Sequence, residues 1–184
     1  MDGLTRVRSP INRQPIDRIP RCDALWEDTL AEWQSQGMPR NTDPGEYFGW
    51  DIVDLFMDAS IRMGNCLLAN NISFWMHSCG NCEAYLEDLI ECGLEVIQPL
   101  QASAGFDVRN LKPRLGARLT FFGNIDVRKM SASEKECEEE IRDKIAAAKE
   151  GYGYIYHSDH SVPPEVTFER YRCIMDRVGK YRAY

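Results

Sequence analysis

Residues 72–86 read ISFWMHSCGNCEAYL, an apolar run that passes into polar residues and turns through Gly80. The apolar half has the length of a buried β-strand, and the residues after the turn begin a helical pattern. Successive side chains of a strand point to opposite faces, so His77 and Cys79, two positions apart, project to the same side. We therefore expect an imidazole and a thiol to converge where this strand ends.

A second stretch, near the other end of the chain, has the same character. Residues 154–161 read YIYHSDHS, so His157 and His160 also follow an apolar strand. In folds that alternate strands and helices, ligands bind at the carboxyl ends of the parallel strands. All three histidines of the chain are thus predicted at the edge of the sheet that suits a binding site.

Strand and helix patterns alternate along the chain with short connections, which favours a parallel sheet and an α/β fold. About six segments are candidate strands, namely residues 17–22, 51–57, 72–77, 94–98, 118–122 and 152–157. Helices are predicted between them, including one that begins with Asp23 as its N-cap and a charged one at 134–150 with a capping box at Ser133 and Glu136.

The composition bounds the class of protein. The chain has 184 residues, 43% of them apolar, and a net charge of -7, which suits one globular domain spanning 1–184. A negative surface is a poor partner for nucleic acid or anionic membranes. Seven cysteines, an odd number, indicate reduced thiols rather than a disulfide framework. The longest apolar runs have the length of a strand, which is too short for a membrane-spanning helix. We expect a cytoplasmic protein that binds neither nucleic acid nor membrane.

Several motifs occur in the same order as in the uroporphyrinogen decarboxylase superfamily. They are HSCGN at 77–81, LEDLIECG at 86–93, VIQPLQ at 96–101, LTFFGNID at 119–126, GYI at 153–155 and VPP at 162–164. On these motifs residues 72–180 resemble the C-terminal half of that superfamily, and residues 15–20 and 46–53 resemble the start of its members. The resemblance implies a TIM-like (β/α) barrel.

The chain is shorter than such a barrel requires. Members of the superfamily form eight-stranded barrels in chains well above this length, so a central block is missing, with an apparent internal deletion near 59–65. The resemblance therefore implies an incomplete TIM-like barrel of about six mainly parallel strands. An open barrel exposes strand edges. The chain would cover them as a homodimer or by wrapping differently, or it would be a non-catalytic, truncated remnant.

One branch of the superfamily transfers methyl groups from corrinoids and holds zinc through a His-x-Cys motif and a later cysteine. His77-Ser78-Cys79 is similar to that motif, and His160 stands close to the place of the later cysteine, just before residues 162–164. The resemblance implies a zinc site of His77, Cys79 and His160 that activates a small thiol, with a corrinoid or a corrinoid protein as methyl donor. Zinc suits nitrogen and sulfur ligands, keeps an open position and holds a bound thiol deprotonated.

Decarboxylation of a tetrapyrrole such as uroporphyrinogen is the alternative activity. The decarboxylases carry an arginine-rich loop after the first strand, where this chain has ALW at 24–26, and such arginines would be needed to bind the substrate carboxylates. In this alternative Asp58 stabilises a protonated pyrrole and His160 contacts the substrate. In the methyltransferase, Asp58 and Asp126 would instead be polar groups that contact the metal or its ligands. Asp126 either orients a ligand or caps the next turn, and the sequence leaves open whether Cys82 or His157 joins the site.

Overall fold

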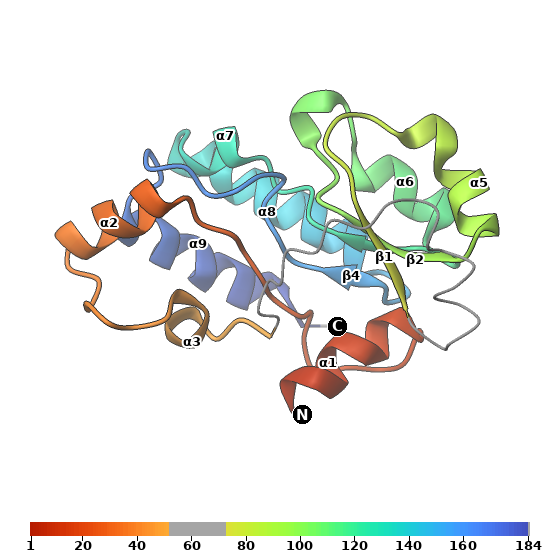
Figure 1. The fold of residues 1–184 in the computed structure, drawn as a ribbon, viewed down its shortest axis with the longest axis horizontal. Helices are drawn as coiled ribbons and strands as arrows, with labels where there is room; N and C mark the ends of the chain where they lie inside the picture. Colours follow the sequence, from red (N-terminus) through yellow and green to blue (C-terminus); the bar gives the residue numbers. More distant parts are fainter. Residues whose placement is uncertain (52–72, 184) are drawn as a thin grey trace.

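A parallel four-stranded sheet lies at the centre of the computed structural model, which describes residues 1–51 and 73–183 (Figure 1). The strands follow one another in the sheet in chain order, as β1 (Phe74–His77), β2 (Leu94–Gln98), β3 (Thr120–Phe122) and β4 (Tyr154–Ile155). Each neighbouring pair is parallel. Parallel strands in sequential order form the wall of a (β/α) barrel, so the predicted α/β class and incomplete TIM-like architecture are confirmed.

The N-terminal segment continues the sheet beyond β4. Arg21 forms a parallel bridge with Tyr156, and the amide of Cys22 donates a 3.1 Å hydrogen bond to the Tyr156 carbonyl. The predicted strand at 17–22 is therefore a bridge beside the last strand, where the first strand of a closed barrel would lie. The candidate strand at 51–57, except for Asp51, and the apparent deletion at 59–65 lie outside the described residues.

Helices connect the strands as the alternating pattern predicts. Between β2 and β3 runs α6 (Val108–Leu115), between β3 and β4 runs α8 (Glu134–Lys149), and α9 (Phe168–Tyr181) follows β4 and lies beside α8 (Figure 1). The capping box of Ser133 and Glu136 at the start of α8 is confirmed. The remaining helices are α1 (Gly3–Ile11), α2 (Glu27–Ser35), α3 (Pro44–Phe48), α5 (Leu86–Glu91), α7 (Val127–Met130) and the short 3-10 helices η2 (Glu83–Tyr85) and η3 (Ala102–Ala104).

The prediction that Asp23 caps a helix is wrong. The helix that follows begins later, with Trp26 at the N-cap position and no side-chain cap. Asp23 is instead only 2% exposed and accepts hydrogen bonds from the hydroxyls of Ser158 and Tyr171. An N-cap carboxylate needs to lie beside the first amides of its helix. The carboxylate of Asp23 is instead bonded to Ser158 and Tyr171 in the C-terminal part of the chain.

An aromatic cluster joins the N-terminal helices to the last helix. The buried Trp33 on α2 packs 4.8 Å from the ring of Tyr171 and 5.8 Å from that of Phe48, and its indole nitrogen donates a 2.7 Å hydrogen bond to the Val166 carbonyl. Buried aromatic side chains supply much apolar area, and the indole N–H is satisfied. This cluster fixes the segment that carries Asp23 and Ala24 against the end of the sheet.

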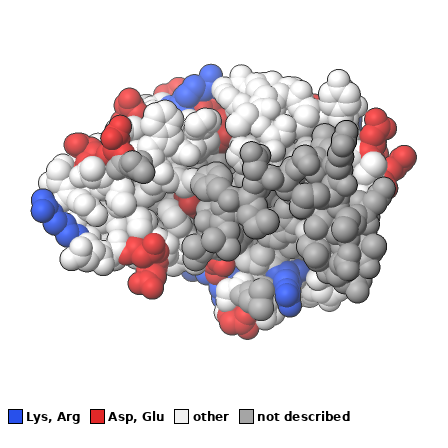
Figure 2. Space-filling model, viewed as in Figure 1, with Lys and Arg blue, Asp and Glu red and all other residues white. Residues whose placement is uncertain are grey.

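The described surface carries the negative charge that the composition implies. On the face drawn in Figure 2, acidic groups gather mainly around the rim and basic groups form a few small clusters. In the described part of the chain, no helix combines the length and the apolar character needed to cross a lipid bilayer.

Candidate active site

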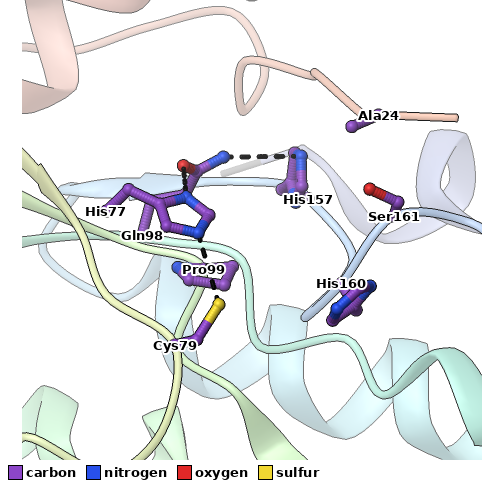
Figure 3. A pocket seen from close by; sticks show the side chains of 8 residues that line it. All are labelled: Ala24, His77, Cys79, Gln98, Pro99, His157, His160 and Ser161. Atoms are coloured by element: carbon purple, nitrogen blue, oxygen red, sulfur yellow. Dashed lines mark hydrogen bonds between the residues drawn. The ribbon is translucent and has the colours of Figure 1, made fainter. Parts of the chain in front are cut away.

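A cavity of about 160 Å³ opens at the carboxyl end of the sheet (Figure 3). His77 and Gln98 are the last residues of β1 and β2, and His157 lies just beyond β4. The lining residues are Ala24, His77, Cys79, Gln98, Pro99, His157, His160 and Ser161. The prediction that all three histidines gather at this edge is confirmed.

His77 and Cys79 converge as the sequence predicts, although β1 ends at His77 and Cys79 lies two residues beyond it. The Cys79 sulfur lies 3.5 Å from Nε2 of His77, and Nδ1 of His77 lies 2.8 Å from the side-chain oxygen of Gln98. The parallel register pairs His77 with Gln98, and the Ser78 amide donates a 2.8 Å hydrogen bond to the Gln98 carbonyl. The imidazole is thus held between a thiol and an amide by the backbone of two neighbouring strands.

His157 belongs to the same hydrogen-bonded group. Its Nε2 lies 3.5 Å from the side-chain nitrogen of Gln98, and its Nδ1 contacts the carbonyl of Ser158. The ring is only 3% exposed and meets the Phe122 ring edge to face at 5.1 Å. His157, which the sequence leaves open, therefore lines the cavity as its most buried histidine.

The buried carboxylate of Asp23 lies behind His157, outside the cavity lining. Asp23 lies 3.9 Å from Nε2 of His157 and accepts hydrogen bonds from Ser158 and from the Tyr171 hydroxyl, the latter at 2.7 Å. Burial raises the pKa of the Asp23 carboxyl, while His157 and the two hydroxyl donors oppose that shift. Sequence reasoning missed Asp23 as a cavity support; its one signal is an acidic residue between Cys22 and Ala24, directly after a candidate strand.

Asp159 ties together the loops at the cavity rim. Its carboxylate accepts hydrogen bonds from the backbone amides of Ala102, Ser103 and Val127, at 2.9, 3.4 and 2.9 Å. These amides follow β2 and β3, whereas Asp159 follows β4. Burial raises the pKa of this carboxyl, and the amide donors counter the effect. Asp159 therefore holds three loops in place, a role that its position between two histidines does not reveal in the sequence.

The remaining predicted site residues are placed apart from His77 and Cys79. His160 lines the cavity from the segment after β4, with an exposed ring 6.1 Å from that of Trp26. Asp126 does not line the cavity; it caps α7 by accepting a 2.9 Å hydrogen bond from the Arg128 amide and also pairs with the Arg128 guanidinium. Of the two roles the sequence allows for Asp126, this geometry supports the cap. Asp58 lies outside the described residues.

Cys82 belongs to a different surface. It borders a separate groove along α5 together with Met76, Tyr85 and Cys92. The C-x-x-C spacing of Cys79 and Cys82 therefore does not bring both thiols into the cavity of the histidines.

Two of the three proposed zinc ligands have suitable spacing. Zinc bonds of about 2.0 Å to nitrogen and 2.3 Å to sulfur, at a tetrahedral angle, place the two donors about 3.5 Å apart. The observed 3.5 Å between His77 Nε2 and Cys79 Sγ fits that value. Within residues 1–51 and 73–183, however, no three His, Cys, Asp or Glu side chains are arranged to hold a metal ion, so His160 lines the cavity without completing a set.

The cavity wall that the structure describes contains no lysine or arginine. Three arginines of the N-terminal segment have other partners. Arg6 and Arg18 both donate to the carboxylate of Asp51, which is 3% exposed. The guanidinium of Arg21 donates a hydrogen bond to the carbonyl of Gly49. The site is thus a small pocket of imidazole, thiol and amide groups rather than a cationic one.

Comparison with known proteins identifies the family. The family model for uroporphyrinogen decarboxylase (URO-D) matches residues 54–181. A uroporphyrinogen decarboxylase from Pseudoalteromonas atlantica is 30% identical over 77 residues, which cover 42% of this chain and 22% of that protein. A solved structure of a methyltransferase from Methanosarcina mazei matches at 19% identity with a TM-score of 0.48, over 65% of this chain and 34% of its own. Because the family match spans more than half of the residues, the chain belongs to the uroporphyrinogen decarboxylase family.

Proposed function

We propose that this chain is a methyltransferase-type member of its family that binds zinc through His77, Cys79 and His160 and methylates a small thiol, with a corrinoid as methyl donor. The observation that carries the proposal is the 3.5 Å contact between Cys79 Sγ and His77 Nε2 at the mouth of the cavity. This spacing matches two adjacent ligands of tetrahedral zinc.

The third ligand in this proposal is His160. Its side chain is exposed, and exposed side chains change rotamer within picoseconds to nanoseconds. His160 lines the cavity that also contains the other two donors, and the proposal makes it the third member of a set of two imidazoles and one thiolate. Asp126, which caps α7, is not part of this set.

Zinc, when bound, would hold the acceptor thiol deprotonated at neutral pH and keep it at an open coordination position. The chain itself would orient its ligands: Gln98 holds the His77 ring, and Asp159 fixes the loops around it. Methyl transfer would form a carbon–sulfur bond and break the carbon–cobalt bond of the corrinoid, leaving that electron pair on cobalt and the thiol proton in solvent. A cavity of about 160 Å³ suits a small thiol.

Decarboxylation of a tetrapyrrole, the activity named for the Pseudoalteromonas relative, has less support. Its substrate carries several carboxylates, which are bound best by arginine, and the described cavity wall has none.

The proposal is tested by incubating the zinc-loaded protein with methylcobalamin and 2-mercaptoethanol. Loss of the methylcobalamin absorption, together with a methyl thioether detected by mass spectrometry, is the expected result. Cys79→Ser should abolish the reaction, and Cys92→Ser, which removes an equally exposed thiol outside the cavity, should not. Carbon dioxide released from uroporphyrinogen, with no methylation of the thiol, would overturn the proposal in favour of the decarboxylase.

A further inference from the structure

A single line of hydrogen-bonding groups crosses the cavity wall from β1 to the end of β4. It runs from the Cys79 thiol to His77 and then through the side chain of Gln98 to His157 (Figure 3). From His157 it ends on the backbone carbonyl of Ser158. Each imidazole uses both ring nitrogens, and the amide of Gln98 lies between the two rings. The position of the proton on one ring therefore determines whether the next group must donate or accept a hydrogen bond.

The Ser158 carbonyl sets the direction of this line because a carbonyl can only accept a hydrogen bond. Nδ1 of His157 must then carry a proton, and in the neutral form of the ring Nε2 has the lone pair. Only the NH₂ group of Gln98 can face that lone pair, so the Gln98 oxygen faces His77 and accepts from its Nδ1–H. Nε2 of His77 is left with its lone pair directed at the Cys79 sulfur.

Of the residues that the structure describes, Asp23 is the acidic group paired with His157, and a charged His157 would alter this pattern. Its nearest oxygen is 3.9 Å from His157 Nε2, which is beyond hydrogen-bond distance. That oxygen contacts the Ser158 hydroxyl, whose proton the His160 carbonyl can also accept, and it accepts from the Ser158 amide at 3.4 Å. The other oxygen accepts from Tyr171 at 2.7 Å. The Asp23 carboxylate is therefore satisfied without a proton from His157.

We infer that Gln98 is a positioning residue that holds His77 in the Nδ1–H tautomer and so presents Nε2 to the cavity. The inference deepens the proposed function, because Nε2 is the atom that would bind zinc there. Histidine ligands of metals commonly donate their other N–H to an acceptor, which fixes the ring and its tautomer, and loss of such an acceptor weakens metal binding by about 10- to 100-fold. In this site the acceptor is an amide oxygen whose orientation is set by a second histidine.

The experiment is ¹⁵N NMR of the histidine rings in the metal-free protein at about pH 8, where an ordinary imidazole is neutral. Three histidines give few enough signals for assignment by single His→Gln variants. We expect His77 in wild-type protein to be protonated at Nδ1. Gln98→Leu should remove that preference, and Gln98→Glu, which keeps an acceptor for His77, should retain it.

Gln101→Leu is the matched control. Gln101 lies at the same end of the sheet and accepts a 2.8 Å hydrogen bond from the Gly80 amide, without contacting His77. An Nε2-protonated His77 in wild-type protein would overturn the inference, as would a tautomer that is unchanged in Gln98→Leu or altered equally by Gln101→Leu.

Zinc affinity provides the second measurement. Gln98→Leu should bind zinc about 10- to 100-fold more weakly than wild type, with Gln98→Glu close to wild type. Since the NMR experiment needs no metal, the expected tautomer in a protein that binds no zinc would contradict only the proposed function. The opposite tautomer in a protein that binds zinc would contradict only the role of Gln98.

Discussion

Tyr171 on α9 donates a 2.7 Å hydrogen bond to the carboxylate of Asp23, which lies 148 positions earlier in the chain and is fully buried. The other carboxylate oxygen accepts from Ser158, next to His157 of the cavity wall. A buried carboxylate is tolerated only when its oxygens are paired. This contact thus joins the first and last parts of the chain directly beneath the candidate site.

Replacement of Tyr171 by phenylalanine tests that contact. The ring packing against Trp33 is retained, but one oxygen of the buried Asp23 loses its donor. We expect the free energy of unfolding to fall by about 1–3 kcal/mol, measured by urea denaturation. Tyr85→Phe, at a residue that is 65% exposed, is the control and should leave the stability unchanged. Equal stabilities of the two variants would contradict a supporting role for this hydrogen bond.

The Asp51 carboxylate predicts a dependence of stability on pH. Burial alone would raise its pKa, but hydrogen bonds from Arg18, the Arg21 amide and Arg6 outweigh burial and lower the pKa below 3.8. As the pH falls, the unfolded chain binds this proton before the folded protein does, so the stabilisation is present above about pH 4 and is lost below it. Urea denaturation of wild-type protein should show this loss.

Asp51→Asn should remove that part of the acid sensitivity. At pH 7 the variant should be less stable by about 2 kcal/mol, because the charged hydrogen bonds are lost, and its stability should change less than that of wild type on acidification. Asp176→Asn, at an exposed position of α9, should retain the wild-type pH profile. If the stability of Asp51→Asn depended on pH as that of wild type does, the hydrogen bonds of Asp51 would not be the source of the acid sensitivity.

Asn124 combines a strained backbone with a fully bonded side chain. Its φ is 75°, and its buried amide donates to the carbonyls of Leu100 and Phe106 and accepts from the Val108 amide. Substitution by glycine or by alanine removes these bonds, and we expect a loss of about 2–4 kcal/mol. Alanine should cost about 1 kcal/mol more than glycine, since only glycine adopts positive φ without strain. Thermal denaturation of both variants checks this order, and an alanine variant as stable as glycine would refute it.

Much of the fold could be predicted because its signals are local. The sequence predicts a strand at 94–98 and a helix from 134 to 150, and the structure has β2 at Leu94–Gln98 and α8 at Glu134–Lys149. The convergence of His77 and Cys79 is likewise predicted from their spacing of two residues, although β1 ends at His77 and Cys79 lies just beyond it. Each of these conclusions depends only on neighbours along the chain.

The roles of Asp23 and Gln98 could not be predicted in the same way. Asp23 obtains its partners from Ser158 and Tyr171, more than a hundred positions away. Gln98 contacts His77 and His157 only because β1, β2 and the segment after β4 end at the same edge of the sheet. Sequence periodicity places a residue at the end of a strand, but it does not determine which side chain from another strand will contact it.

The most direct test of the proposed site is the zinc content of the purified protein, measured by elemental analysis after zinc loading and removal of unbound metal. We expect about one zinc per chain, lost in His77→Ala and Cys79→Ser, reduced in His160→Ala and retained in Cys92→Ser. Circular dichroism establishes that each variant is folded. A folded wild-type protein without zinc, or one whose zinc survives both His77→Ala and Cys79→Ser, would contradict the proposed metal site.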